Sequence, residues 1–217
     1  MSTRATVLAR ISAALADVPS SETPDSALVP RDYRTSHASS DLVSLFVERA
    51  ADHGASVIHT TEGKAARTVA ATLAERGAES VVLPPGFPET LLEEGSVKRL
   101  GDVPPLSLES LDAAAGVLTT AVLGIAVTGT VVLDAGPGQG RRALSLLPDY
   151  HLCVIREDQI VGDVPEALSR LDPTAPLTFI SGPSATSDIE LDRIEGVHGP
   201  RTLDVIVVAA RPAEEPS

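Results

Sequence analysis

Residues 113–133 form a stretch of 21 residues without a single charge, and this stretch restricts the folds open to the chain more than any other feature. Its length is that of a membrane-spanning helix, which needs about 20 apolar residues. However, it contains Gly116, Gly124, Gly129 and four threonines, and it is flanked by aspartates rather than by basic, Trp or Tyr residues. Strands covered on both faces also read as continuous apolar runs. We therefore predict two buried strands joined by a tight turn, and no membrane span.

The composition agrees with a fold of strands and helices. The chain has 217 residues, which suits one domain with a small appendage at about 150 residues per domain. Hydrophobic residues make up 43% of it, but only 2% of the residues are aromatic. The core must therefore consist mainly of Ala, Val, Leu and Ile.

The net charge limits the partners that the chain can have. It is −13 at pH 7, with no compensating run of Lys and Arg. A surface of that sign repels nucleic-acid phosphates and anionic lipids, so we exclude both as partners. A small anionic ligand remains possible where Arg, His and backbone N–H groups converge.

Cys153 is the only cysteine of the chain. A single thiol cannot make an internal disulfide, a cysteine zinc site or an iron–sulfur cluster. The residues around it, 151–155, have the pattern of a strand, which predicts a buried and unreactive thiol. A reducing cytoplasmic location is the expectation, because no signal peptide opens the sequence.

Helical spacing of apolar residues and short β-branched runs predict the elements of the fold. Ser40 is the expected N-cap of the second helix, and Gly54 is its expected end. Helices are predicted at residues 6–16, 41–53, 62–76, 88–94, 107–114 and 165–171. Strands are predicted at residues 55–59, 80–83, 117–120, 130–133, 151–155, 177–180 and 204–209.

The order of these elements predicts an α/β fold with an open, mostly parallel, Rossmann-like sheet. The strand–helix–strand unit over residues 55–83 implies a parallel pair of strands. A segment rich in Pro, Ser and Asp separates the first helix from the remainder. We expect three parts: a helical arm and linker at 1–36, the α/β domain at 37–210 and a polar tail at 211–217.

Two glycine-containing turns in the middle of the chain are candidate anion sites. Gly129 can take a positive φ and expose N–H groups, and Thr128 and Thr130 add hydroxyls. A plain turn between core strands is the alternative. Residues 136–142 hold three alternating glycines followed by Arg141 and a second arginine, a pattern typical of an anion-binding turn. The spacing fits neither a dinucleotide fingerprint nor a Walker A loop, and a surface loop with solvated arginines is the alternative.

Three later features could contribute chemistry. His151 opens a predicted strand, where it could act as acid, base or ligand or serve the structure alone. In the run Ser-Gly-Pro-Ser-Ala-Thr-Ser-Asp-Ile-Glu, Ser184 could cap a helical turn, and Asp188 and Glu190 add carboxylates. His198 lies in a Gly-Val-His-Gly-Pro turn, and we expect it to belong to the site.

In this order and spacing, TGT, GRRALSLLPDYH, SGPSATSDIE and GVHGP resemble the LUD domain of the lactate utilization protein C family. The resemblance covers roughly residues 117–208, and more loosely the chain from residue 41. It implies the fold shared by glucosamine-phosphate deaminase, ribose-phosphate isomerase and the CoA transferases. It also implies a role in a three-component system that oxidises L-lactate to pyruvate, in which other subunits carry the iron–sulfur clusters.

Val127 departs from the family, which usually has an acidic residue at this position. A carboxylate there would be the natural general base or nucleophile, so its absence argues against independent catalysis. No catalytic residue is assigned, although Asp188, Glu190 and His198 are candidates. The residues expected to bind a ligand are Thr128, Gly129, Thr130, Arg141, His151, Ser184, Thr186, Asp188 and His198.

The leading hypothesis is a non-redox component of a lactate-oxidising system, which binds an anionic ligand or its iron–sulfur partner subunits. On this hypothesis the chain itself holds no cofactor. The second hypothesis, by analogy with the fold, is a stand-alone enzyme acting on a phosphorylated or CoA-linked substrate. A third is a metal site made by His151, Asp188 and His198, although these residues lack short-range ligand spacing.

Overall fold

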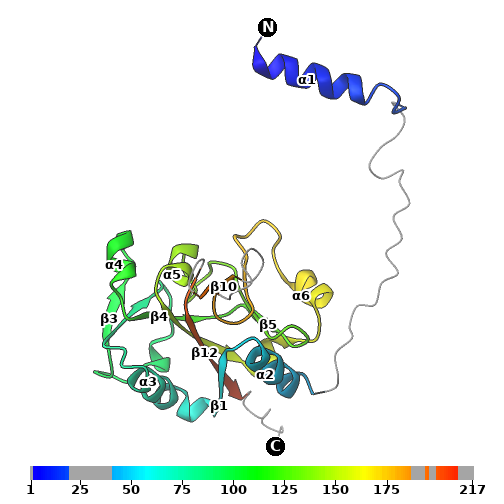
Figure 1. Cartoon of the computed structure of the whole chain (residues 1–217). Coiled ribbons are helices and arrows are strands. Elements are labelled where there is room, and N and C mark those ends of the chain that lie inside the picture. The colour runs from blue at the N-terminus through cyan, green and yellow to red at the C-terminus, as the bar shows by residue number, and fades with distance from the viewer. Residues whose placement is uncertain (1, 20–40, 187–193, 196–198, 210–217) are drawn as a thin grey trace, which may run out of the picture. The chain divides into compact units, whose positions relative to one another are not determined.

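The computed structural model describes residues 2–19, 41–186, 194–195 and 199–209 (Figure 1). The chain divides into two compact units, Met1–Arg34 and Thr35–Ser217. The first unit holds α1 (Thr3–Ala14), which is capped by the hydroxyl of Ser2 accepting from the Ala5 N–H at 3.3 Å. None of the residues of α1 is buried. The predicted first helix is therefore confirmed, with its boundaries moved two or three residues toward the N-terminus.

The second unit alternates strands and helices, as the sequence predicts. Its helices are α2 (Leu42–Asp52), η2 (Glu62–Lys64), α3 (Ala65–Glu75), η3 (Glu89–Leu91), α4 (Leu108–Asp112), α5 (Arg142–Leu146), η4 (Glu157–Gln159) and α6 (Val164–Arg170). Its strands are β1 (Ser56–Thr61), β2 (Ser80–Leu83), β3 (Lys98–Gly101), β4 (Gly116–Thr120), β5 (Leu123–Ile125), β6 (Thr130–Leu133), β7 (Tyr150–Arg156), β8 (Ile160–Val161), β9 (Thr178–Ile180), β10 (Ala185–Thr186), β11 (Ile194–Glu195) and β12 (Thr202–Ala209).

Six of the strands form one sheet in the order β1-β12-β7-β4-β2-β3, and all neighbours run parallel. This confirms the predicted open parallel sheet of an α/β fold. One detail of the prediction is wrong: β1 and β2 share the sheet but are not a pair. β1 pairs with β12 instead, from Ser56 beside Asp204 to Thr61 beside Ala209, because the chain returns to that edge only at its last strand.

The uncharged stretch does not fold as one hairpin of the large sheet. β4 lies in the large sheet, whereas β5 and β6 form an antiparallel pair in a second sheet, ordered β8-β5-β6-β9. Only β5 and β8 run parallel in this small sheet. Every residue of β5 and β6 is buried, which explains the absence of charge. None of the described helices is both long and apolar enough to cross a membrane.

The large sheet is covered on both faces, as its continuous apolar strands require. Alternate residues of β7 point to opposite sides: Tyr150, Leu152 and Val154 pack with α3, and Cys153 and Ile155 pack with α2 and the small sheet. A further cluster joins α4 and α5 to β2 and β4 through Leu111, Leu144, Val82 and Val117. The helix α6 covers the outer side of the small sheet.

Local signals fix the ends of the helices. The N-cap of α2 is Asp41, whose carboxylate accepts from the Ser44 N–H at 3.0 Å, so the predicted cap at Ser40 is off by one residue. Gly54 and Gly77 follow α2 and α3 with φ of 88° and 64°, as expected for glycines that end helices. Asp163 caps α6, and its carboxylate accepts from the N–H of Val164 at 2.8 Å.

Candidate functional site

Two segments near the end of the chain meet in the structure: the Ser-Gly-Pro-Ser turn at residues 181–184 and the Gly-Val-His-Gly-Pro turn at residues 196–200. We call them the late turns. The backbone N–H of Ser184 donates to the carbonyl of Pro200 at 2.8 Å, which joins the Ser-Gly-Pro-Ser turn to the Gly-Pro end of the last turn. Gly182 has a φ of 82°, and a Cβ there would lie 2.4 Å from the carbonyl oxygen of His53. The turn therefore packs directly on the end of α2, which only a glycine permits.

The Thr-Gly-Thr turn lies against the same helix. Gly129 has a φ of 57°, and a Cβ there would lie 2.3 Å from the backbone nitrogen of Ala50. The predicted positive φ is thus confirmed, and the close approach to α2 gives a second reason for glycine. The N–H of Gly129 donates to the carbonyl of Ala126 at 3.2 Å, which closes the turn.

Three hydroxyls connect these turns in a row. The hydroxyl of Thr130 lies 2.7 Å from that of Thr128 and 2.7 Å from that of Ser181. Thr130 is buried, Thr128 is half-buried and Ser181 is exposed. We call Thr128, Thr130 and Ser181 the hydroxyl row. The structure thus brings together the two segments that the sequence singled out, and it adds Ser181, which sequence reasoning missed.

The glycine-rich loop after β6 is anchored rather than solvated. The N–H groups of Gly136, Gly138, Gln139 and Gly140 donate to the Asp134 carboxylate, the Pro85 carbonyl and, for the last two, the Gly136 carbonyl. The remaining residue of the run, Pro137, has no N–H. The four amides therefore stabilise the loop, and none of them is left to bind a phosphate.

This loop fills the crevice at the carboxyl ends of β2 and β4. The N–H of Thr120, the last residue of β4, donates to the Gly138 carbonyl at 2.8 Å. A Cβ on Gly138 would lie 2.7 Å from the Thr120 hydroxyl, and one on Gly86 would lie 2.9 Å from Pro137. Close backbone approach is therefore the physical reason for the alternating glycines.

Arg141 has an internal partner. Its Nε and one Nη donate to the two carboxylate oxygens of Asp102 at 2.8 and 3.0 Å, and the same Nη donates to the Leu106 carbonyl at 2.8 Å. The guanidinium holds the pKa of the Asp102 carboxyl below its usual value. Ligand binding by Arg141 stays a prediction, and the contacts give the side chain a structural role.

His151 is fully buried in β7, away from the hydroxyl row. Its Nε2 lies 2.7 Å from the hydroxyl of Thr119, and its Nδ1 has no hydrogen-bond partner among the described residues. Burial lowers its pKa to about 4, so the imidazole is neutral at pH 7. Its neighbours across the sheet are Val117 and Leu203, which place it within the core.

Several predicted site residues lie outside the described part of the chain. Asp188, Glu190 and His198 are among them, and the side chain of Thr186 in β10 is likewise not described. Among the residues that the structure does describe, no group of three His, Cys, Asp or Glu side chains gathers to hold a metal ion. The roles proposed for these four residues stay predictions.

A cavity of ≈ 640 Å³ lies at the carboxyl ends of the central parallel strands, and the glycine-rich loop contributes Pro137 and Gln139 to its lining. The chain goes from β2 to β3 on one side and then returns to β4 on the other, so the direction of the crossovers reverses beside this cavity. Ligands of open α/β sheets bind at such a point. Its lining includes Glu62, Ala65, Leu91, Thr120, Pro137, Gln139, Val154, Arg156, Gln159 and Val208.

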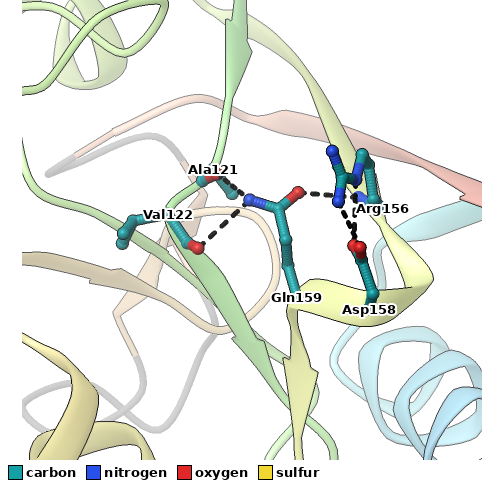
Figure 2. A network of polar contacts seen from close by, with 5 residues as sticks. All are labelled: Ala121, Val122, Arg156, Asp158 and Gln159. Atoms are coloured by element: carbon teal, nitrogen blue, oxygen red, sulfur yellow. Dashed lines mark hydrogen bonds and ion pairs between the residues drawn. The ribbon is translucent and has the colours of Figure 1, made fainter.

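One wall of this cavity is held by Gln159 (Figure 2). Its amide nitrogen donates to the carbonyls of Ala121 and Val122 at 2.9 and 3.1 Å, and its amide oxygen accepts from the Arg156 N–H at 2.9 Å. Arg156 in turn forms an ion pair with Asp158. Every polar atom of the Gln159 amide is thus used to fix the chain reversal after β4 against the end of β7.

The sequence profile of the LUD domain matches residues 105–208, which include the hydroxyl row, the glycine-rich loop and the late turns. The chain is 46% identical over 172 residues to lactate utilization protein C of Deinococcus radiodurans, covering 77% of this chain and 80% of that protein. The chain belongs to the LUD-domain family of lactate utilization protein C. The resemblance predicted from the motifs is therefore confirmed.

Two further relatives and one solved structure are also similar to the chain. Lactate utilization protein C of Halalkalibacterium halodurans is 38% identical over 102 residues, covering 43% of this chain and 44% of that protein. Escherichia coli YkgG is 35% identical over 161 residues, covering 65% and 68%. The crystal structure of a DUF162 family protein from Deinococcus radiodurans is 40% identical with a TM-score of 0.66, over 77% of this LUD-domain chain and 96% of that one.

Proposed function

We propose that this LUD-domain protein is a non-redox component of a multi-subunit system that oxidises L-lactate to pyruvate. The observation that carries the proposal is the 46% identity to lactate utilization protein C of Deinococcus radiodurans, over four-fifths of that protein's length. Because the match to the LUD domain over residues 105–208 includes the hydroxyl row and the glycine-rich loop, we expect these turns to serve the same role in both proteins.

The single cysteine supports a role without electron transfer by this chain. Cys153 is fully buried in β7, and burial raises the pKa of its thiol to about 12. One buried thiol cannot supply the four thiolates that hold an iron–sulfur cluster. We therefore propose that the electrons taken from lactate pass to cofactors on other subunits, and that iron–sulfur subunits are those partners.

The geometry of the turns favours partner binding over capture of a free anion. The loop amides and Arg141, which the sequence nominates for an anion, all have partners within the chain. The hydroxyl row, by contrast, ends at Ser181, which is exposed. We propose that the hydroxyl row and the joined late turns contact the partner subunits in the cytoplasm.

Growth and co-purification test this proposal together. A strain lacking the gene should grow on pyruvate but not on L-lactate as sole carbon source, and the wild-type gene should restore growth. When the tagged protein is purified from lactate-grown cells, proteins that contain iron and sulfide should co-purify with it. Normal growth of the deletion strain on L-lactate would contradict the role in lactate oxidation. Purification of the tagged protein without any other protein would contradict the partner role.

A further inference from the structure

The cavity at the carboxyl ends of β4, β7 and β12 contains an unused hydrogen-bond donor. Gln139 is only 6% exposed, and its amide oxygen accepts from the Asp134 N–H at 2.7 Å, which sets the orientation of the amide. Its amide nitrogen has no acceptor among the described residues, yet the side chain lines the cavity. Among the described residues, the only buried side-chain polar atom without a partner is Nδ1 of His151, so the amide nitrogen of Gln139 is open to the cavity, where it can donate to an acceptor on a ligand.

The contrast with Gln159 shows that the unused donor is not a general feature of this wall. Both glutamines line the same cavity. The amide nitrogen of Gln159 has two carbonyl acceptors, those of Ala121 and Val122, whereas that of Gln139 has none within the described part of the chain. The hydroxyl of Thr120, beside Gln139 in the lining, also makes no hydrogen bond with a described residue. Gln139 and Thr120 therefore form a polar part of the lining that can donate two or three hydrogen bonds to a ligand.

The remaining walls are mostly apolar. The lining also includes Leu91, Pro137, Val154 and Val208, and the volume of ≈ 640 Å³ falls within the usual range for small-molecule sites. A flat ring with an acceptor at its edge would accept from the Gln139 and Thr120 donors and could place its faces on these side chains. A molecule as small as lactate would leave most of this apolar surface in contact with water.

The charges in the lining disfavour a polyanion. Arg156 is the one cation among the lining residues, and it is paired with Asp158 and interacts with the carboxylate of Glu62. The lining therefore offers no free positive charge to a phosphate. The Glu62 carboxylate can accept hydrogen bonds from hydroxyl groups of a ligand.

We propose that this cavity binds a nucleoside: an uncharged ring base whose carbonyl or ring nitrogen accepts from Gln139 and Thr120. The sugar hydroxyls then lie toward the carboxylate of Glu62. This site is separate from the hydroxyl row and does not depend on the role in lactate oxidation. Its test requires only the purified full-length chain.

Calorimetric titration of the purified chain tests the proposal. The probes are adenosine, guanosine, cytidine and uridine, compared with ATP, sodium L-lactate and sodium pyruvate. At least one nucleoside should bind saturably at one per chain, about tenfold or more tighter than each anion. Absence of saturable binding by all four nucleosides, or tighter binding of ATP, lactate or pyruvate, would overturn the proposal.

Matched variants locate the site. Thr120→Val removes the hydroxyl with little change of shape, and Gln139→Glu keeps the oxygen that accepts from Asp134 while it removes the amide donor. Each should weaken nucleoside binding about tenfold, the effect of one lost hydrogen bond. Thr178→Val in β9, a buried threonine that does not line the cavity, should leave the affinity unchanged. Undiminished binding by Thr120→Val would overturn the location even if Gln139→Glu failed to fold.

Discussion

Arg141 clamps the buried carboxylate of Asp102 with two donors, at 2.8 and 3.0 Å, across 39 residues of sequence. The side chain of Asp102 is 5% exposed and that of Arg141 is 36% exposed. The pair fastens the glycine-rich loop to the segment that follows β3. Arg141 therefore holds the loop in the crevice between β2 and β4, and does not project into solvent, which was the alternative that the sequence left open.

Replacing Arg141 should destabilise the fold. Arg141→Ala leaves the Asp102 carboxylate buried without its charged partner, so we expect a loss of about 1–3 kcal/mol in the free energy of unfolding. Arg142→Ala is the matched control, because that side chain is exposed, and it should change stability by less than about 0.5 kcal/mol. Urea unfolding followed by circular dichroism measures both. Equal stability of the two variants would show that the Arg141 clamp is unimportant.

The same pair predicts a dependence on acid. Arg141 lowers the pKa of Asp102 in the folded state, so its contribution is present above the ordinary pKa of the carboxyl. It is lost as the pH falls through the lowered value. The difference in stability between wild type and Arg141→Ala should accordingly shrink below about pH 4. A difference that stays constant from pH 7 to pH 3 would contradict this assignment.

Gly129 should tolerate no side chain. In Gly129→Ala the new Cβ would lie 2.3 Å from the Ala50 nitrogen, in addition to the strain of a positive φ. We expect a loss of more than about 2 kcal/mol, and a larger loss for Gly129→Val. Thermal unfolding of the purified variants provides the measurement.

Two other glycines separate the causes of that loss. A Cβ on Gly77 meets nothing within 4 Å although φ is 64°, so Gly77→Ala should cost about 1 kcal/mol from strain alone. Gly63 is open and has no positive φ, so Gly63→Ala should be neutral. If Gly129→Ala lowered the melting temperature no more than Gly77→Ala, the overlap with α2 would not exist as described.

His151 should make stability depend on pH between 7 and 4. Its folded pKa of about 4 lies below the ordinary 6.5, so the unfolded chain binds the proton first. Stability is therefore fully present above pH 6.5 and falls by about 3 kcal/mol as the pH drops toward 4. His151→Leu should show a flatter profile over this range, whereas His53→Gln, at an exposed histidine, should keep the wild-type slope. Parallel profiles for wild type and His151→Leu would exclude this role.

Most of the elements could be predicted from the sequence because they depend on local patterns. The strand over residues 80–83 and the buried β7 follow from runs of β-branched residues, and α2 follows from helical spacing. The pairing of β1 with β12 could not be predicted, because it joins Ser56 to Asp204 and no local pattern specifies which edge a final strand joins. The small sheet was missed for the same reason.

The candidate sites were predicted less completely than the fold. Gly129 could be recognised because a positive φ restricts residue type, and its neighbouring hydroxyls follow in sequence. The ion pair of Arg141 with Asp102 could not be predicted, because the two residues lie 39 residues apart in the sequence. Gln139 carried no signal of its own, although it lies inside the glycine-rich run. Its importance depends on an amide nitrogen left without an acceptor, which only a structure can reveal.

Asp204, like Asp102, is a buried carboxylate that is paired with an arginine. It is 1% exposed in β12 and accepts from Arg76 at 2.6 and 2.8 Å and from the Tyr150 hydroxyl at 2.9 Å. These bonds tie the end of α3 to the sheet. Tyr150→Phe removes one donor to a charged acceptor, so we expect a loss of about 1–3 kcal/mol. Arg67→Ala, at an exposed arginine of α3, is the control and should be neutral.

The alkaline profile tests whether the folded state holds the Tyr150 hydroxyl in its protonated form. Burial, and then the neighbouring Asp204 carboxylate, raise the pKa of the Tyr150 hydroxyl far above its usual value of 10. The folded state thus holds this proton more tightly than the unfolded state, and the stabilisation is present below pH 10 and declines above it. Wild type should therefore lose stability above pH 10 more steeply than Tyr150→Phe in urea unfolding. If the two lost stability in parallel, the Tyr150 hydroxyl would not be buried beside the Asp204 carboxylate as described.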